Sequence, residues 1–132
     1  MYYQKDWFMC QIQTLIQKIA QVVFNKDSVK YEIEDVTNVT ETDILYARLT
    51  QLLSEYEICQ AENLLFDNIE PDNKKFLILA LDFYSAVNTF TDAELREANF
   101  TRSEIDEGLN EILATFKISL EEVSKEISEG KK

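Results

Sequence analysis

Residues 74–89, KKFLILALDFYSAVNT, decide the fold of this chain. Their apolar side chains, from Phe76 to Val87, recur at nearly every angle around a helix instead of along one stripe. A helix that is apolar all round is surrounded by other elements, whereas a surface helix has one apolar face. We therefore predict a central helix here, and we expect the rest of the chain to pack around it.

The segments on both sides of this helix also have helical spacing of their apolar residues. Further helices are predicted near residues 6–24, 45–56, 58–69, 105–116 and 120–128. The chain has only two glycines and one proline, too few for the tight turns of a hairpin-rich sheet. These features predict an all-α fold, a compact bundle of about five to seven helices.

Helix starts are indicated by one recurring pattern, in which a Ser or Thr follows an apolar residue and an acid stands three positions further on. In such a capping box the hydroxyl accepts from the third helical amide, and the acid accepts from the amide of the cap residue. The pattern occurs at Thr91 with Glu94, Thr101 with Glu104, and Ser119 with Glu122. Thr40 with Asp43 is a weaker case, and Asp72 after Pro71 is a fifth predicted cap.

The stretch from Asn25 to Val39 has no helical period, and its apolar residues alternate with charged ones. We expect an extended linker here, because no second alternating run exists to pair with it as a strand. The predicted organisation is a single domain, residues 1–132. It comprises an amphipathic helix at about 6–24, the linker 25–39, a helical body 40–128 and a frayed tail 129–132.

Composition argues against several classes of function. There is no histidine, which removes the commonest general base and the commonest zinc ligand. The net charge of −12 opposes binding to nucleic acid, whose phosphates attract basic proteins. Neither a membrane-spanning apolar run nor a signal peptide is recognisable, so we expect a cytoplasmic protein.

Motifs for cofactors and metals are also missing. No glycine-rich phosphate loop occurs, and residues 67–73 lack the glycine turn of an EF-hand, so we expect no cofactor and no metal. Cys10 and Cys59 match no zinc or redox spacing, and we expect both to be small buried hydrophobic residues. A noncatalytic protein is the resulting expectation.

Two resemblances extend this interpretation. DILYARL at 43–49 and AENLLFD at 61–67 give residues 42–73 a partial similarity to the helix pair of a tetratricopeptide repeat, with a generic helical hairpin as the alternative. MYYQKDW at 1–7, AENLLF at 61–66 and LDFY at 81–84 make most of the chain resemble a family of small uncharacterised bacterial helical proteins. That second resemblance implies an all-helical cytosolic protein and no particular activity.

The first predicted helix differs in charge from the rest of the chain. Residues 1–30 hold four lysines against two aspartates, a net of +2, which leaves −14 for residues 31–132. The polar face of the helix has several glutamines and no acid, as suits a surface covered by protein. We predict an interface there that includes Trp7, Phe8, Gln13 and Gln17. Packing on the chain's own body, a homodimer contact and peripheral membrane attachment remain as alternatives, and the last is disfavoured by the single lysine on this face.

The sequence favours a protein-interaction or scaffold domain that binds a protein partner, or a second copy of itself, through apolar helical faces. The alternative is a small-molecule binder or a carboxylate-dependent enzyme with a pocket between helices. A cavity lined by Tyr46, Phe83 or Tyr84, beside a buried acid with a raised pKa, would favour this alternative.

Overall fold

The fold was obtained as a computed structural model, which describes the backbone of residues 2–26 and 30–118 and, within these ranges, the side chains from residue 10 onward. The described residues form six helices and no strand, which confirms the predicted all-α fold. The helices are α1 (Tyr2–Phe24), α2 (Glu41–Ser54), α3 (Ile58–Asp67), α4 (Lys74–Asn88), α5 (Asp92–Glu97) and α6 (Arg102–Thr115). The helix predicted at 120–128 and its cap Ser119 lie outside the described residues.

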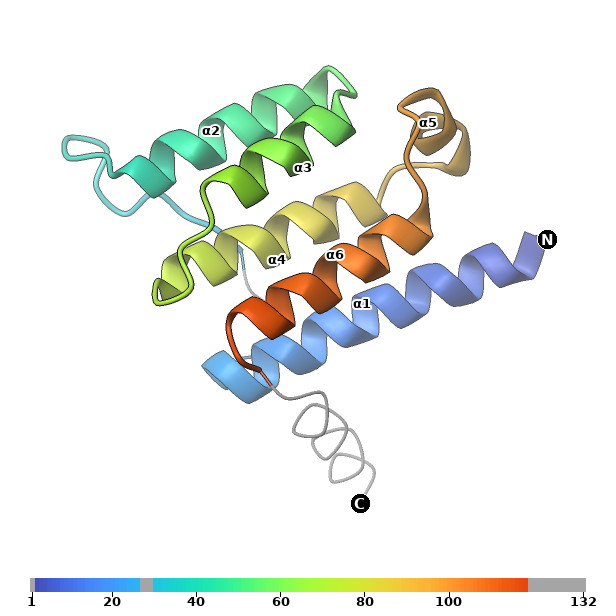
Figure 1. Cartoon of the computed structure of the whole chain (residues 1–132), viewed down its shortest axis with the longest axis horizontal. Helices are drawn as coiled ribbons and strands as arrows, with labels where there is room; N and C mark the ends of the chain where they lie inside the picture. Colours follow the sequence, from blue (N-terminus) through green and yellow to red (C-terminus); the bar gives the residue numbers. More distant parts are fainter. Residues whose placement is uncertain (1, 27–29, 119–132) are drawn as a thin grey trace.

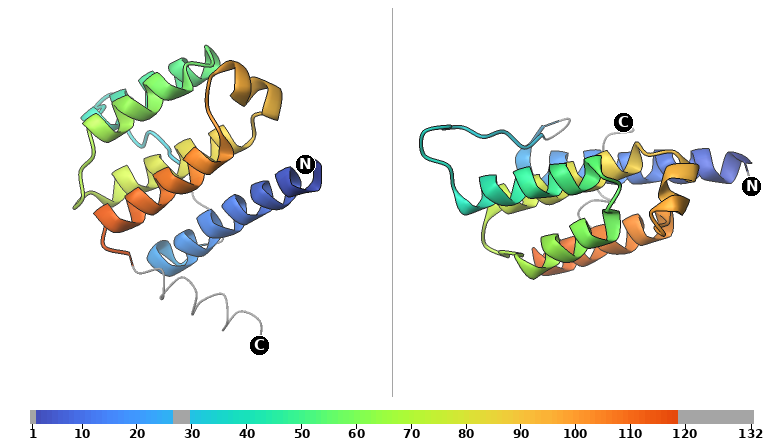
Figure 2. Two further views of the ribbon diagram at one scale, coloured as in Figure 1. Left: turned by 45° about the vertical axis from the view of Figure 1, so that its right-hand side comes forward. Right: turned by 90° about the horizontal axis from the view of Figure 1, so that it is seen from above.

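The helices lie in two layers, with α4 at the centre of one of them (Figure 1). Helices α1 and α2 flank α4, and α3 and α6 form the second layer, as the view from above shows (Figure 2). Helix α3 packs on α2 as a helical hairpin, while α6 packs on α4 and α1. The short helix α5 lies at one end of the molecule and links the two layers (Figure 2).

Helix α4 is the central helix that residues 74–89 predict. Its buried side chains point in all directions around the axis, as expected for a helix with neighbours on three sides. These side chains are Phe76, Leu77, Leu79, Ala80, Leu81, Phe83, Tyr84, Val87 and Asn88. The sequence missed its N-terminal cap, however. Asn73 rather than Asp72 accepts the backbone N–H groups of Lys75 and Phe76, so the prediction for Asp72 is wrong.

The other predicted caps within the described residues, at Thr40, Thr91 and Thr101, fall where expected. Full capping boxes form at Thr40 with Asp43 and at Thr91 with Glu94. At α6 the hydroxyl of Thr101 accepts from the amide of Glu104, without the reciprocal bond of a capping box from the Thr101 backbone N–H to the Glu104 carboxylate. A cap is a local interaction between residues three apart, which explains why the sequence alone locates it.

Helix α1 begins at Tyr2, four residues before the predicted start, and ends at Phe24 as expected. The described parts of the linker, residues 25–26 and 30–39, form no helix or strand. Most side chains of residues 30–39 are exposed, but the side chain of Tyr31 is buried and only 2% exposed. The linker is therefore fixed to the helical body at that residue.

Two buried contacts hold the layers together. Tyr84 of α4 passes between α3 and α6, where its hydroxyl donates to Glu62 Oε2 at 2.6 Å and its ring tip fills the space beside Gly108. Arg102 at the start of α6 is 7% exposed and donates to the backbone carbonyls of Asn88 and Phe90. These bonds fix the end of α4 against the start of α6.

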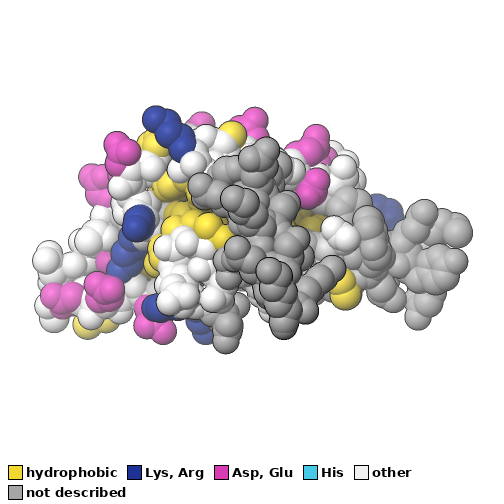
Figure 3. Space-filling model, turned by 90° about the horizontal axis from the view of Figure 1, so that it is seen from below, with side chains coloured by type: hydrophobic (Ala, Val, Ile, Leu, Met, Phe, Trp, Pro, Cys, Tyr) yellow, Lys and Arg dark blue, Asp and Glu magenta, His cyan; other side chains and the backbone are white. Residues whose placement is uncertain are grey.

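The described part of the face seen from below shows a group of hydrophobic side chains, with charged side chains toward the edges (Figure 3). Leu15, Val22, Val23 and Phe24 of α1 are partly buried against the core. In the part of the chain that the structure describes, no helix combines the length and the apolar character needed to cross a membrane.

Candidate functional site

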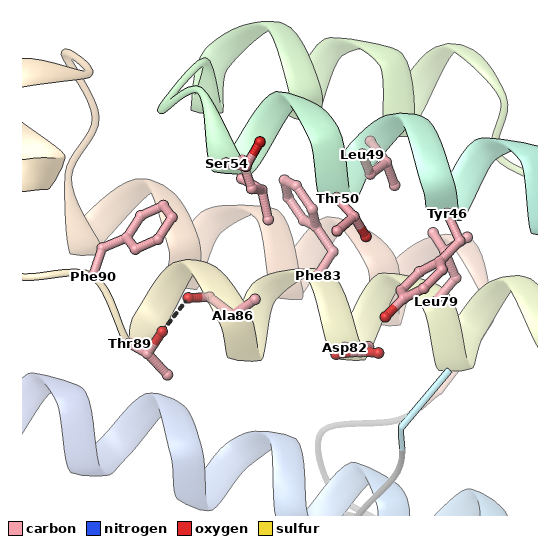
Figure 4. A pocket seen from close by; sticks show the side chains of 11 residues that line it. Tyr46, Leu49, Thr50, Ser54, Leu79, Asp82, Phe83, Ala86, Thr89 and Phe90 are labelled. Atoms are coloured by element: carbon pink, nitrogen blue, oxygen red, sulfur yellow. Dashed lines mark hydrogen bonds between the residues drawn. The ribbon is translucent and has the colours of Figure 1, made fainter. Parts of the chain in front are cut away.

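A groove with a volume of about 290 Å³ lies between α2 and α4, on the side of these helices that faces away from α3 and α6 (Figure 4). Helix α2 provides one wall, helix α4 the other, and the turn after α4 closes one end. The lining residues are Tyr46, Leu49, Thr50, Leu53, Ser54, Leu79, Asp82, Phe83, Ala86, Thr89 and Phe90.

Small side chains from both helices line part of the groove along the α2–α4 seam. Thr50 and Ser54 of α2 and Ala86 of α4 lie along the middle of the seam. Tyr46 lies toward one end of the groove and Phe90 at the other (Figure 4).

The walls between these ends are apolar and firmly held. Leu49, Leu79 and Phe83 line the groove and are at most 5% exposed, so each is fixed by the core behind it. A cavity with such walls is preformed, because core side chains pack densely and do not collapse into it without cost.

Asp82 is the acidic side chain of the groove, and it lies near Tyr46 (Figure 4). It is partly buried, and its Oδ2 accepts a hydrogen bond of 2.9 Å from the backbone N–H of Tyr31. Burial raises the pKa of the Asp82 carboxyl above its ordinary value, and the bond from Tyr31 and the charge of Lys30 oppose that rise only in part.

Tyr31 contacts two of the residues that line the groove, Asp82 and Tyr46. Its ring stacks on Tyr46 with 4.6 Å between ring centroids, and its hydroxyl donates to Asp43 Oδ1 at 2.5 Å. The ammonium group of Lys75 lies 5.1 Å from the centre of the Tyr31 ring, a cation–π distance. Burial and the neighbouring Asp43 carboxylate raise the pKa of the Tyr31 hydroxyl, which therefore remains protonated and keeps donating.

Two hydroxyl groups of the groove use their protons within their own chain segments. Ser54 Oγ donates to the Gln51 carbonyl and Thr89 Oγ1 donates to the Ala86 carbonyl, each at 2.6 Å. The oxygen of each group keeps acceptor capacity, because a hydroxyl has one proton and two lone pairs.

Among the aromatic residues that the sequence singled out, the structure brings Tyr46 and Phe83 to the groove. Tyr84 lies elsewhere, since its hydroxyl binds Glu62 on the α3 side of the core. Sequence reasoning missed Asp82, although one signal was present. Asp82 is the single acid inside the apolar run from Phe76 to Val87, and such a residue needs a partner or a solvated opening.

The four residues predicted to form an interface all lie on α1. The side chains of Trp7 and Phe8 are outside the described residues, whereas Gln13 is partly buried and Gln17 is exposed. Helix α1 also packs on α4 and α6, with Ile12, Ile16 and Ile19 buried. It is thus a core helix with a polar outer side, and the interface on it stays a prediction.

The cysteine prediction is wrong, because Cys10 and Cys59 are both exposed. Cys59 Sγ lies 3.6 Å from the carbonyl oxygens of Ala98 and Asn99. Burial of the sulfur itself, followed by the nearby carboxylates of Glu104, Glu62 and Glu57, raises the pKa of the Cys59 thiol. A raised pKa reduces the thiolate population, so this cysteine is not activated as a nucleophile.

A second group of acids lies where α3 faces α6. Burial raises the pKa of Glu62, and the charges of Glu104, Glu107 and Glu111 raise it further, while the Tyr84 hydroxyl opposes the rise. Within the described ranges, no three acidic or cysteine side chains are arranged as a metal site. The acids here act on one another through their charges.

Comparison with known proteins places the chain in a family. The chain belongs to a family of unknown function, DUF6483, whose model matches residues 2–117. No curated protein and no solved structure matches it. The match covers all six described helices, so the groove between α2 and α4 lies within the region that defines the family.

Proposed function

We propose that this member of the DUF6483 family is a noncatalytic binding protein, which holds a small and mainly apolar molecule in the groove between α2 and α4. The observation that supports this proposal is the groove itself, a preformed opening whose apolar walls are backed by the core and whose polar groups are few. Apolar walls with a few placed polar groups are typical of ligand sites in proteins.

The volume of the groove sets the size of the ligand. An apolar cavity of about 150 Å³ admits benzene, and sites for drug-sized ligands begin at about 300 Å³. A groove of about 290 Å³ therefore has room for one ring with a short chain. We expect such a probe to bind with a dissociation constant on the order of 1 mM or below, because a ligand of this size offers few atoms.

Binding is tested by filling the groove. Ala86→Phe places a ring in the middle of the seam, whereas Ala47→Phe adds the same ring to an exposed position of α2 that does not line the groove. Ligand-observed NMR would measure binding of 3-phenylpropan-1-ol to the native protein and to both variants, and circular dichroism would confirm their helicity. We expect Ala86→Phe to abolish binding and Ala47→Phe to preserve it. Equal binding to all three proteins would refute the proposal.

Protein binding through α1 is a second candidate function, in which Trp7, Phe8, Gln13 and Gln17 contact a partner chain or a second copy. The supporting observation is the outer side of α1, where Gln11, Thr14 and Gln17 are exposed and no acid occurs. Covering such a surface with protein costs less desolvation free energy than covering the acidic surface of the rest of the molecule, because no charged carboxylate leaves water.

A matched pair of variants tests this second function. Ile16→Glu places a charge in the core and should disrupt folding, whereas Gln17→Glu should matter only if its face is covered. Native mass by light scattering and capture of a partner by each folded protein provide the readout. Unchanged mass and unchanged capture for Gln17→Glu would exclude the interface.

A further inference from the structure

We propose that the ligand of the α2–α4 groove has a cationic nitrogen head group that binds the carboxylate of Asp82, with its apolar body lying along Phe83 toward Phe90. The inference rests on the proposed function, since it names the chemical class of the molecule that the groove would hold. It follows from the acceptors and charges that line the groove.

Asp82 is positioned to receive such a group. Its Oδ2 is held by the backbone N–H of Tyr31, which fixes the orientation of the carboxylate without neutralising its charge. The same carboxylate lines the groove, and no ion pair to it is formed in the described part of the chain. A carboxylate has room for about four hydrogen bonds, so further donors can be accommodated.

Two of the hydroxyl groups that line the groove have their protons engaged. Ser54 and Thr89 donate to carbonyls of their own segments, so they offer no proton to an anionic head group, and their oxygens keep acceptor capacity.

Charge supports the same choice. Among the described residues that line the groove, none is a lysine or arginine, and the chain has a net charge of −12. A cation is therefore attracted toward the groove and an anion is repelled from it. Lys30 is the basic residue whose charge acts on Asp82, and it would compete weakly with a cationic ligand.

Three probes with the same apolar body separate the alternatives: 3-phenylpropylamine, 3-phenylpropan-1-ol and 3-phenylpropanoate. Their dissociation constants for the full chain would be measured at neutral pH by NMR titration. We expect the amine to bind about tenfold or more tightly than the alcohol, because a charge-assisted hydrogen bond to a partly buried carboxylate exceeds a neutral one. The carboxylate probe should bind most weakly.

Two variants assign the preference to Asp82. Asp82→Asn keeps an acceptor for the Tyr31 N–H and removes the charge, so it should reduce the amine-to-alcohol ratio to about threefold or less. Asp67→Asn removes an exposed charge on α3 that does not line the groove and should keep the ratio. Lys30→Gln should tighten binding of the amine, since the competing cation is gone.

The outcomes separate this inference from the proposed function. If the amine and the alcohol bind equally, or the carboxylate probe binds best, the groove binds ligands but the inference is wrong. If the preference survives in Asp82→Asn, Asp82 is not its source and the inference is also wrong. If none of the three probes binds the native protein, the proposed function fails and the inference fails with it.

Discussion

The side chain of Asp82 in α4 accepts a hydrogen bond from the backbone N–H of Tyr31, a residue 51 positions earlier in the chain. This bond ties the extended linker to the rim of the α2–α4 groove. The Tyr31 ring then stacks on Tyr46 of α2, so one linker residue contacts both walls at the same end. The linker is therefore held against both helices that form the groove.

Ionisation of Asp82 should lower the free energy of unfolding. Its pKa is raised in the folded protein, chiefly by burial, so the folded state binds the proton more tightly than the unfolded state does. The ionised carboxylate thus lowers stability at neutral pH, and this loss disappears as pH falls below the ordinary value of 3.8.

Asp82→Asn should therefore be more stable than the native protein at neutral pH, and this advantage should vanish at acidic pH. Urea unfolding followed by circular dichroism at both pH values measures the difference. A variant that is less stable at neutral pH would show that the Tyr31 N–H and Lys30 favour the ionised carboxylate by more than burial disfavours it, contrary to the raised pKa.

The space beside Gly108 should tolerate no side chain. A Cβ at this position would overlap the hydroxyl and ring tip of Tyr84, which is fully buried and bound to Glu62. We expect Gly108→Ala to destabilise the protein by about 1–3 kcal/mol, because overpacking of a core outweighs the roughly 1 kcal/mol that alanine gains in a helix.

Chemical unfolding of Gly108→Ala and of the double variant with Tyr84→Leu measures this clash. Leucine removes the overlapping atoms, so the double variant should lose less stability than the sum of the two single variants. Additive losses would mean that the two positions are independent.

Replacing Arg102 by lysine should reduce the stability of the protein. Its guanidinium donates to two backbone carbonyls, those of Asn88 and Phe90, and also binds the side chains of Asn88 and Asp92. The single ammonium group of lysine cannot donate to all of these acceptors in the planar geometry of a guanidinium, and the side chain of methionine has no hydrogen-bond donor. We expect Arg102→Lys to cost about 1–3 kcal/mol and Arg102→Met about 3 kcal/mol or more.

Differential scanning calorimetry gives the comparison, with Arg96→Met as the exposed control on α5. The control should lie within about 0.5 kcal/mol of the native protein. If Arg102→Met matched the control, the bonds at the junction of α4 and α6 would contribute nothing to stability.

The sequence predicted the elements that depend on local signals. The apolar circumference of residues 74–89 and the boxes at Thr40 and Thr91 are read from residues a few positions apart, and the structure confirms them. Whether the cysteines were buried could not be read in this way. Cys59 follows the buried Ile58 directly, and a shift of one residue on a helix turns a side chain to a different face.

The groove could not be predicted from patterns of residues that are close together in the sequence. Its walls come from α2 and α4, which are separate in the sequence and meet only in the fold. Thr50, Ser54 and Ala86 are ordinary helix residues in sequence, and only the fold brings them to one seam. Asp82 was identifiable as an acid within an apolar run, but its contact with Tyr31 depends on the path of the linker.

The most direct test of the central claim is a chemical-shift titration of the ¹⁵N-labelled protein with 3-phenylpropan-1-ol. We predict saturable shifts that are confined to the lining segments of α2 and α4 and to the turn at Thr89 and Phe90, with α6 unaffected. The absence of saturable shifts, or saturable shifts centred on α6 or α1, would contradict it.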